Sequence, residues 1–188
     1  MSNPFGAGVL GEPEDWEINF SSDPIVAWRT WRVAIDFRRP KDEKRHLLPK
    51  LGDQFTLMST NYALRWPQRR PMISHCLPQL HNPYRSCNGL THSRPGLKTS
   101  CGIYAFKERD SSERYFSGST VVFGQVLLWG QVIRFTEGYR AERAYPHALW
   151  LFPRRMDMDY VERIADGMRE AYGVETHTLL DWDARERP

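Results

Sequence analysis

The sequence lacks any apolar run of about 18 residues, the length that a helix needs to cross a lipid bilayer. Its first residues, MSNPFGAGVLGEPEDWE, also lack the cationic and apolar segments of a secretory signal peptide. The chain has three cysteines, Cys76, Cys87 and Cys101, an odd number that cannot pair completely in disulfides. These absences predict a cytoplasmic protein whose cysteines are thiols or metal ligands.

Recognisable catalytic motifs are missing as well. The sequence contains no HExxH, no P-loop, no GxGxxG and no GxSxG. It therefore lacks the residues that define zinc peptidases, nucleotide-binding proteins and α/β-hydrolases. There are no internal repeats. Two kinds of catalytic site are still compatible with the sequence. One is a nucleophilic pair of Cys101 with His92 or His147, and the other is an open metal site. The prediction is that the protein is a binding protein rather than an enzyme.

What the chain does have is enough apolar residues for a core. Of its 188 residues, 40% are hydrophobic and 13% are aromatic. This length and composition predict one ordinary domain. We expect an acidic flexible arm at 1–23, a single domain at 24–180 and a charged tail at 181–188.

Alternation of apolar and polar residues predicts the strands. A period of two is present in VAWRTWRVAIDF, and CGIYAFK and GVETHTLLDW resemble short strands. The run VVFGQVLLWGQVIRF is too long for a straight strand in this domain, so Gly124 and Gly130 are expected to be bends or bulges. A turn at Glu137 and Gly138 then leads into a hairpin partner that is expected to break at Pro146.

A helix is predicted near the end of the chain. In DYVERIADGMREAYG the apolar residues form one stripe, Asp159 and Glu162 match a capping box, and Gly173 follows the last turn. The fold class predicted is therefore α+β: a strongly bent antiparallel sheet, forming a small open barrel, packed by a C-terminal amphipathic helix. The sheet is accompanied by one long loop that a metal ion could staple.

Charge is strongly segregated along the chain. Residues 1–23 hold five acids and no base, whereas residues 24–70 hold eleven Lys or Arg against four acids, a net charge of +7. Such a basic segment indicates an anion-binding face for nucleic acid or an acidic protein partner, with a solvated loop as the alternative. The candidate residues are Arg38, Arg39, Lys44, Arg45, Trp66, Arg69 and Arg70.

The segment EGYRAERAYPH adds a second set of cations and aromatic rings. Tyr139, Arg140 and Arg143 are candidates for clamping a phosphate or stacking on a base. The alternative is a structural ion pair of Arg140 or Arg143 with Glu142. The residue pattern leaves both open.

About thirty residues from Pro67 to Ser100 contain five prolines and no sustained periodicity. Long irregular segments are uncommon in compact domains. They usually either carry a function or are held in place by a cross-link such as a metal site. Cys76, Cys87 and, at its end, Cys101 lie in this stretch together with three of the six histidines.

Several motifs resemble a family of small uncharacterised bacterial and phage proteins. These motifs are WRTWRV, LRWPQRRP, CGIYAF, VLLWGQVI, GYRAERAYP and HALWL, in this order, over roughly residues 26–152. In that family a loop of the form HxxPxxxCxCGIYA leads into the LWGxV and GYRAExAYP segments. The family has no activity that could be carried over.

The resemblance implies a ligand set. His92 and Cys101 match the family's His and second Cys, Cys76 or Cys87 matches its upstream Cys, and Thr99 stands where its first CxC cysteine would be. A Cys3His set of Cys76, Cys87, His92 and Cys101 would suit structural zinc. His75 and His81 compete with His92 for the nitrogen position, and the alternative is that the cysteines are buried small hydrophobes.

Overall fold

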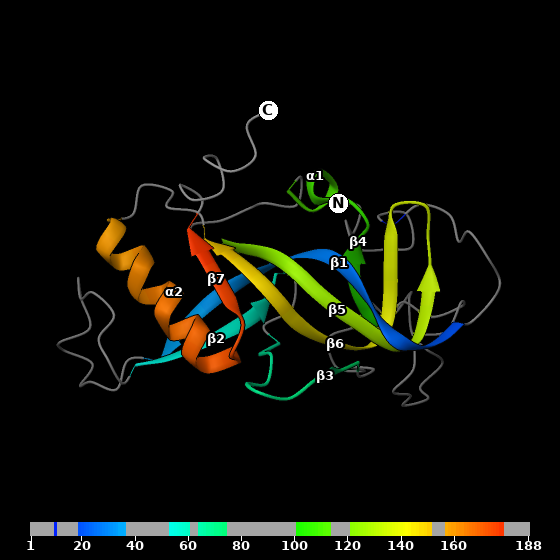
Figure 1. Cartoon of the computed structure of the whole chain (residues 1–188), viewed down its shortest axis with the longest axis horizontal. Coiled ribbons are helices and arrows are strands. Elements are labelled where there is room, and N and C mark those ends of the chain that lie inside the picture. Colours follow the sequence, from blue (N-terminus) through cyan, green and yellow to red (C-terminus); the bar gives the residue numbers. More distant parts are fainter. Residues whose placement is uncertain are drawn as a thin grey trace, which may run out of the picture. The chain divides into compact units, whose positions relative to one another are not determined.

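The computed structural model describes residues 10, 19–36, 53–60, 64–74, 101–113, 121–151 and 157–178. Within these ranges the chain forms seven strands and two helices (Figure 1). The strands are β1 (Asn19–Asp36), β2 (Gln54–Ser59), β3 (Met72–Ile73), β4 (Ile103–Phe106), β5 (Val121–Arg134), β6 (Gly138–Leu151) and β7 (Glu175–Thr178). The helices are α1 (Arg109–Glu113) and α2 (Met158–Tyr172).

Strand pairing closes a ring through four strands. β1 pairs with β4, β4 with β6, β6 with β5, and β5 with β1. A sheet whose pairing returns to its first strand must bend. The structure is thus mostly sheet, strongly bent, with two helices among the described residues, and it agrees with the predicted α+β class. The open barrel and the metal-stapled loop remain predictions.

The expectation of a wholly antiparallel sheet is wrong for one pair. β7 runs parallel to β6, with Ala148 opposite Glu175 and Leu151 opposite Thr178. The chain leaves β6, forms α2 and returns to β7, and a parallel pair needs a crossover of this kind.

The predicted break at Pro146 is also wrong, because β6 continues through this residue. β3 pairs with β6 up to Ala144, and β7 pairs with it from Ala148. Pro146 therefore lies where β6 changes partners, a position at which a missing N–H is tolerated.

The chain divides into two compact units, and β1, β5 and β6 contribute to both. Unit 1 comprises residues 1–29, 71–114 and 125–145, and unit 2 comprises residues 30–70, 115–124 and 146–188. The first strand begins at Asn19, within the segment that the sequence assigned to the flexible arm. No helix of the described residues is both long and apolar enough to cross a membrane.

Unit 1 is organised around the first half of β6. β4 pairs with residues 138–141 and β3 with residues 143–144. Phe135 and Gly138 exchange backbone hydrogen bonds at the turn that joins β5 to β6. Gly130, before this turn, has φ = +76°, a left-handed conformation that favours glycine. The bend or bulge expected at this residue stays a prediction.

Unit 2 consists of a sheet covered by α2. The buried stripe of the helix is formed by Val161, Ile164, Ala165, Met168 and Tyr172, as its periodicity predicts. The helix packs against β2 and β7 (Figure 1). Beneath it the core contains Trp31, Leu57 and Trp66.

The ends of α2 differ in how well the sequence predicts them. Gly173 has φ = +67° and its N–H donates to the carbonyl oxygen of Arg169, which confirms the predicted C-terminus. The predicted capping box is wrong, because Asp157 caps the helix and accepts from the N–H of Asp159 at 2.9 Å. The helix thus begins two residues earlier than the box pattern indicated.

Candidate functional site

Arg65 is fixed at the end of the β1–β2 pair. Asp36 and Gln54 are the last partners in the register of these two strands. The guanidinium of Arg65 donates two hydrogen bonds to the Asp36 carboxylate, one of them 3.1 Å long. This hydrogen bonding raises the pKa of Arg65, and its side chain is still 54% exposed. An exposed arginine, ion-paired with Asp36, therefore stands where β1 ends.

Trp66 belongs to the core of unit 2 instead of an exposed stacking surface. Its side chain is only 2% exposed. The indole N–H donates to Ser59 Oγ at 3.1 Å, and its ring meets Trp31 edge to face with centroids 5.4 Å apart. In this conformation a nucleobase cannot reach it.

Arg69 has an unusual backbone and a fixed side chain. Its φ is +52°, and no other non-glycine residue of the described ranges has a positive φ. Side chains other than glycine are uncommon in this left-handed region. The guanidinium of Arg69 donates to the carbonyl oxygen of Glu170 at 2.7 Å, near the end of α2. Arg69 and its neighbour Arg70 are both exposed.

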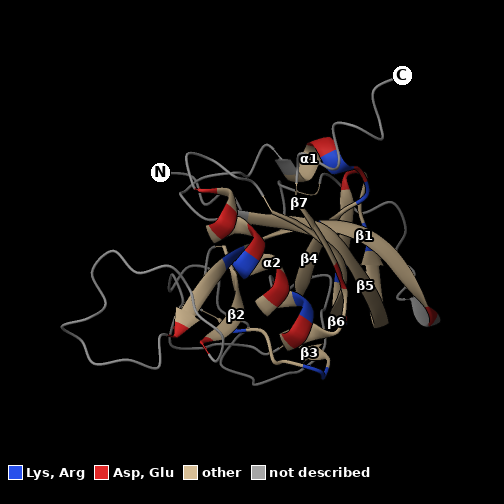
Figure 2. Ribbon diagram, turned by 60° about the vertical axis from the view of Figure 1, so that its left-hand side comes forward, with Lys and Arg blue, Asp and Glu red and all other residues tan. Residues whose placement is uncertain are grey.

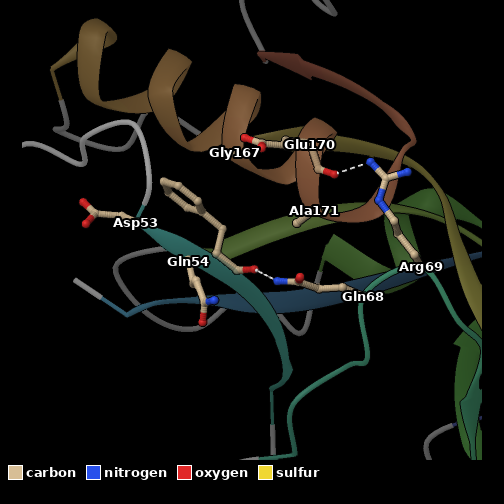
Figure 3. A pocket seen from close by; sticks show the side chains of 8 residues that line it. Asp53, Gln54, Gln68, Arg69, Gly167, Glu170 and Ala171 are labelled. Atoms are coloured by element: carbon tan, nitrogen blue, oxygen red, sulfur yellow. Dashed lines mark hydrogen bonds between the residues drawn. The ribbon is translucent and has the colours of Figure 1, made fainter. Parts of the chain in front are cut away.

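A pocket of about 390 Å³ lies beside Arg69, between β2 and α2 (Figure 3). Its walls are formed by Asp53, Gln54, Phe55, Gln68, Arg69, Gly167, Glu170 and Ala171. Gln68 donates its side-chain amide to the carbonyl oxygen of Phe55 at 2.8 Å. The Phe55 ring contacts Gly167 so closely that a methyl group there would lie 2.2 Å from Cδ2. The pocket thus combines an apolar wall with amide, carboxylate and guanidinium groups.

The sequence pattern did not indicate Phe55, Gln68 or Glu170 as site residues. One signal was available, since Gly167 interrupts an otherwise good helix, and an isolated glycine inside a helix often marks close packing. The pocket arises from three segments that are distant in the sequence. Side-chain periodicity alone does not bring them together.

The predicted cations of the EGYRAERAYPH segment, Arg140 and Arg143, belong to unit 1. Arg140 is buried, with its guanidinium carbon 5.3 Å from the centroid of the Phe135 ring and 5.9 Å from that of Tyr104. Arg143 is half exposed and its Nε lies 3.6 Å from the Glu142 carboxylate. This contact matches the structural ion pair that was the alternative for EGYRAERAYPH. Tyr139 is half-buried, and the Lys107 ammonium lies over its ring.

Arg29 of β1 is a further arginine among the strands of unit 1. The guanidinium of Arg29 donates to the carbonyl oxygen of Tyr104. Burial lowers the pKa of Arg29 to about 10, so this side chain stays charged at neutral pH. Its role is therefore to join β1 to β4 through a charged hydrogen bond.

Most of the predicted metal set falls outside the described residues. Cys76, Cys87 and His92 are outside them, as are Arg38, Arg39, Lys44 and Arg45 of the basic segment. Cys101 is described and is buried just before β4. No three His, Cys, Asp or Glu side chains of the described ranges are grouped so that they could hold a metal ion.

Comparison with known proteins adds no family. No protein-family model, no curated protein and no solved structure matches this chain.

Proposed function

We propose that this protein binds nucleic acid through the end of the β1–β2 pair in unit 2, without catalysing a reaction on it. One observation carries the proposal. Residues 37–52 connect Asp36 to Asp53, and they hold six Lys or Arg against two acids. Since Asp36 lies opposite Gln54, this basic connection leaves and re-enters the sheet at one place, which is where Arg65 is fixed.

Exposed cations of the described chain extend this basic end. The segment after β2 carries three exposed arginines, Arg65, Arg69 and Arg70. The opposite sign dominates α2, whose Asp159, Glu162, Asp166 and Glu170 outnumber Arg163 and Arg169 (Figure 2). Cations that neutralise phosphates release condensed counterions, which favours binding of a polyanion. We therefore assign the contact to the strand end and the 37–52 connection, not to the exposed face of the helix.

Binding should depend steeply on salt and little on sequence. The measurement is fluorescence anisotropy with labelled DNA and RNA between low and physiological salt. Replacing Arg38, Arg39, Lys44 and Arg45 together by alanine should weaken binding to all sequences alike. The log-log salt slope should fall by about 0.7–0.9 for each phosphate that the variant no longer neutralises. Phosphate contacts position a protein without reading the bases, so sequence preference should not change.

The control for this variant is Arg163→Ala, which removes an exposed cation from α2. It should leave the affinity and the salt slope unchanged. Absence of binding at high micromolar protein in low salt would contradict the proposal. Binding of an acidic protein instead, weakened in the same way by the fourfold variant, would assign the basic end to a protein partner.

We further propose that the segment 75–100 is stapled by structural zinc on Cys76, Cys87, His92 and Cys101. Support comes from the two anchors of this segment. Ser74 donates its N–H to the carbonyl oxygen of Glu142, and Ile103 lies opposite Ala141. Both ends are thus held at neighbouring positions of β6, and two of the proposed thiolates lie within two residues of these anchors.

Metal analysis of the purified protein tests this proposal. We expect about one zinc per chain, because four ligands of the Cys3His type make one closed tetrahedral site. Removing it with a chelator should lower the melting temperature. Alanine variants of His75, His81 and His92 should separate the nitrogen ligand from the two bystanders. Metal-free protein of undiminished stability, with three freely titrating thiols, would refute the site.

The alternative of a Cys/His enzyme gains no specific support. Cys101 is 9% exposed, whereas a nucleophilic thiol must be reached by its substrate. Of its two predicted partners, His92 is outside the described residues and His147 occupies an exposed position of β6. The burial of Cys101 therefore favours a binding function over a Cys/His enzyme.

A further inference from the structure

We infer that the pocket between β2 and α2 holds one unpaired base of single-stranded nucleic acid, with Arg69 as its anchor. This inference rests on the nucleic-acid binding proposed above and names the form of nucleic acid. It depends on three features: the fixed guanidinium, the chemistry of the walls, and the position of the pocket beside the basic end.

Arg69 is held ready for a planar ligand. A long exposed side chain normally loses conformational freedom when it binds. Here one N–H is already bound to the carbonyl oxygen of Glu170 at 2.7 Å, while the backbone adopts a φ of +52°. Backbone strain of this kind is often found at binding sites. The faces of the guanidinium plane can stack on a base, a common mode of recognition for unpaired bases.

The pocket walls match a flat ring with a polar edge. Phe55 and Ala171 provide apolar surface, whereas Gln68 and Glu170 provide an amide and a carboxylate (Figure 3). Side chains of these polar types bind the hydrogen-bonding edges of bases. A volume of about 390 Å³ lies within the range of pockets for small organic ligands.

The position of the pocket connects it to the phosphate-binding surface. Asp53 lines the pocket and is also the residue at which the basic connection 37–52 ends. Arg69 lines the pocket and the next residue, Arg70, is exposed, so a nucleic-acid backbone bound by these two cations would pass the mouth of the pocket. In a duplex the bases are paired and stacked, so only a single strand can place a base there without the cost of unpairing.

The test compares a labelled single strand of about 12 nucleotides with the duplex of the same sequence, by fluorescence anisotropy. The wild-type protein should prefer the single strand by roughly tenfold, because one base stacked on a side chain contributes about that factor. Ala171→Leu fills the pocket without changing charge. It should abolish the preference and leave the salt slope of the remaining binding unchanged.

Two further variants make the result interpretable. Glu162→Leu places the same side chain on the exposed face of α2, outside the pocket. Because it also removes a negative charge, the ratio of the two affinities is compared, and its preference for the single strand should equal that of the wild type. Arg69→Lys keeps the positive charge but removes the planar guanidinium, so it should lower the preference severalfold. Arg69→Lys alone decides the question if Ala171→Leu does not fold.

The outcomes separate this inference from the function on which it rests. Salt-dependent binding with equal affinity for both forms, or a preference that survives Ala171→Leu and Arg69→Lys, would overturn the base pocket and leave the proposed function standing. Absence of binding to either form would overturn both.

Discussion

Replacing Gly124 by alanine should prevent folding or lower the free energy of unfolding by about 3 kcal/mol. A Cβ at this position would lie 2.2 Å from the carbonyl oxygen of Ala148 and 3.1 Å from the Cα of Leu149. Both are backbone atoms of β6, so no rotation of a side chain relieves the overlap. To admit the methyl group, β5 would have to move away from the strand with which it pairs.

Urea unfolding followed by circular dichroism measures this effect. The control is Gln125→Ala, because Gln125 is the next residue of β5 and is only half-buried. We expect the control to cost no more than about 1 kcal/mol, as surface substitutions generally do. A Gly124→Ala variant as stable as this control would show that the two strands are further apart than the structure has them.

The two glycines of β5 show how far sequence reasoning reaches. An isolated glycine in an apolar run indicates a bend, a bulge or a close approach. The bends or bulges expected at Gly124 and Gly130 stay predictions, but each position has a reason for glycine. Gly130 has a positive φ, whereas Gly124 has a backbone oxygen where its Cβ would be. The sequence predicts that each position requires a glycine. Whether the reason is a positive φ or a close backbone contact depends on the partner strand.

Local periodicity predicted α2 and most strands, because it reflects burial on one face of an element. It did not predict pairing. The parallel partnership of β6 and β7 depends on where α2 returns the chain, and the continuity of β6 at Pro146 depends on which strands stop beside it. These are properties of distant segments, which a local pattern does not contain.

The arrangement of the candidate site could not be predicted from local sequence patterns either. Trp66 has Arg65 beside it in the sequence and two arginines soon after, which suggested an exposed stacking ring. Its indole instead packs on Trp31, a residue of another strand. Arg69 was predicted as a cation, but its contact with the end of α2, 101 residues further along, could not have been. Composition identified the charges, and tertiary packing decided which of them face solvent.

The second large effect is expected at Tyr172, the last residue of α2. Its hydroxyl group joins two segments of unit 2, because it accepts from the N–H of Leu57 at 2.8 Å and donates to the carbonyl oxygen of Trp66 at 3.0 Å. The side chain is 2% exposed, so water does not easily replace it. The hydroxyl thus completes the backbone hydrogen bonding of β2 from the helix.

Tyr172→Phe should lower the free energy of unfolding by at least about 2 kcal/mol, since each buried backbone group left without a partner costs about 1–3 kcal/mol. Tyr160→Phe makes the same chemical change on the same helix, at a half-buried ring whose hydroxyl has no hydrogen-bond partner among the described residues. It should change stability by no more than about 0.5 kcal/mol. Urea unfolding of both variants gives the comparison.

Because phenylalanine keeps the ring and its packing, a destabilisation confined to Tyr172→Phe can be assigned to the two hydrogen bonds. Equal stability of the two variants would mean that Leu57 and Trp66 find other partners, and that α2 is held to β2 by apolar packing alone.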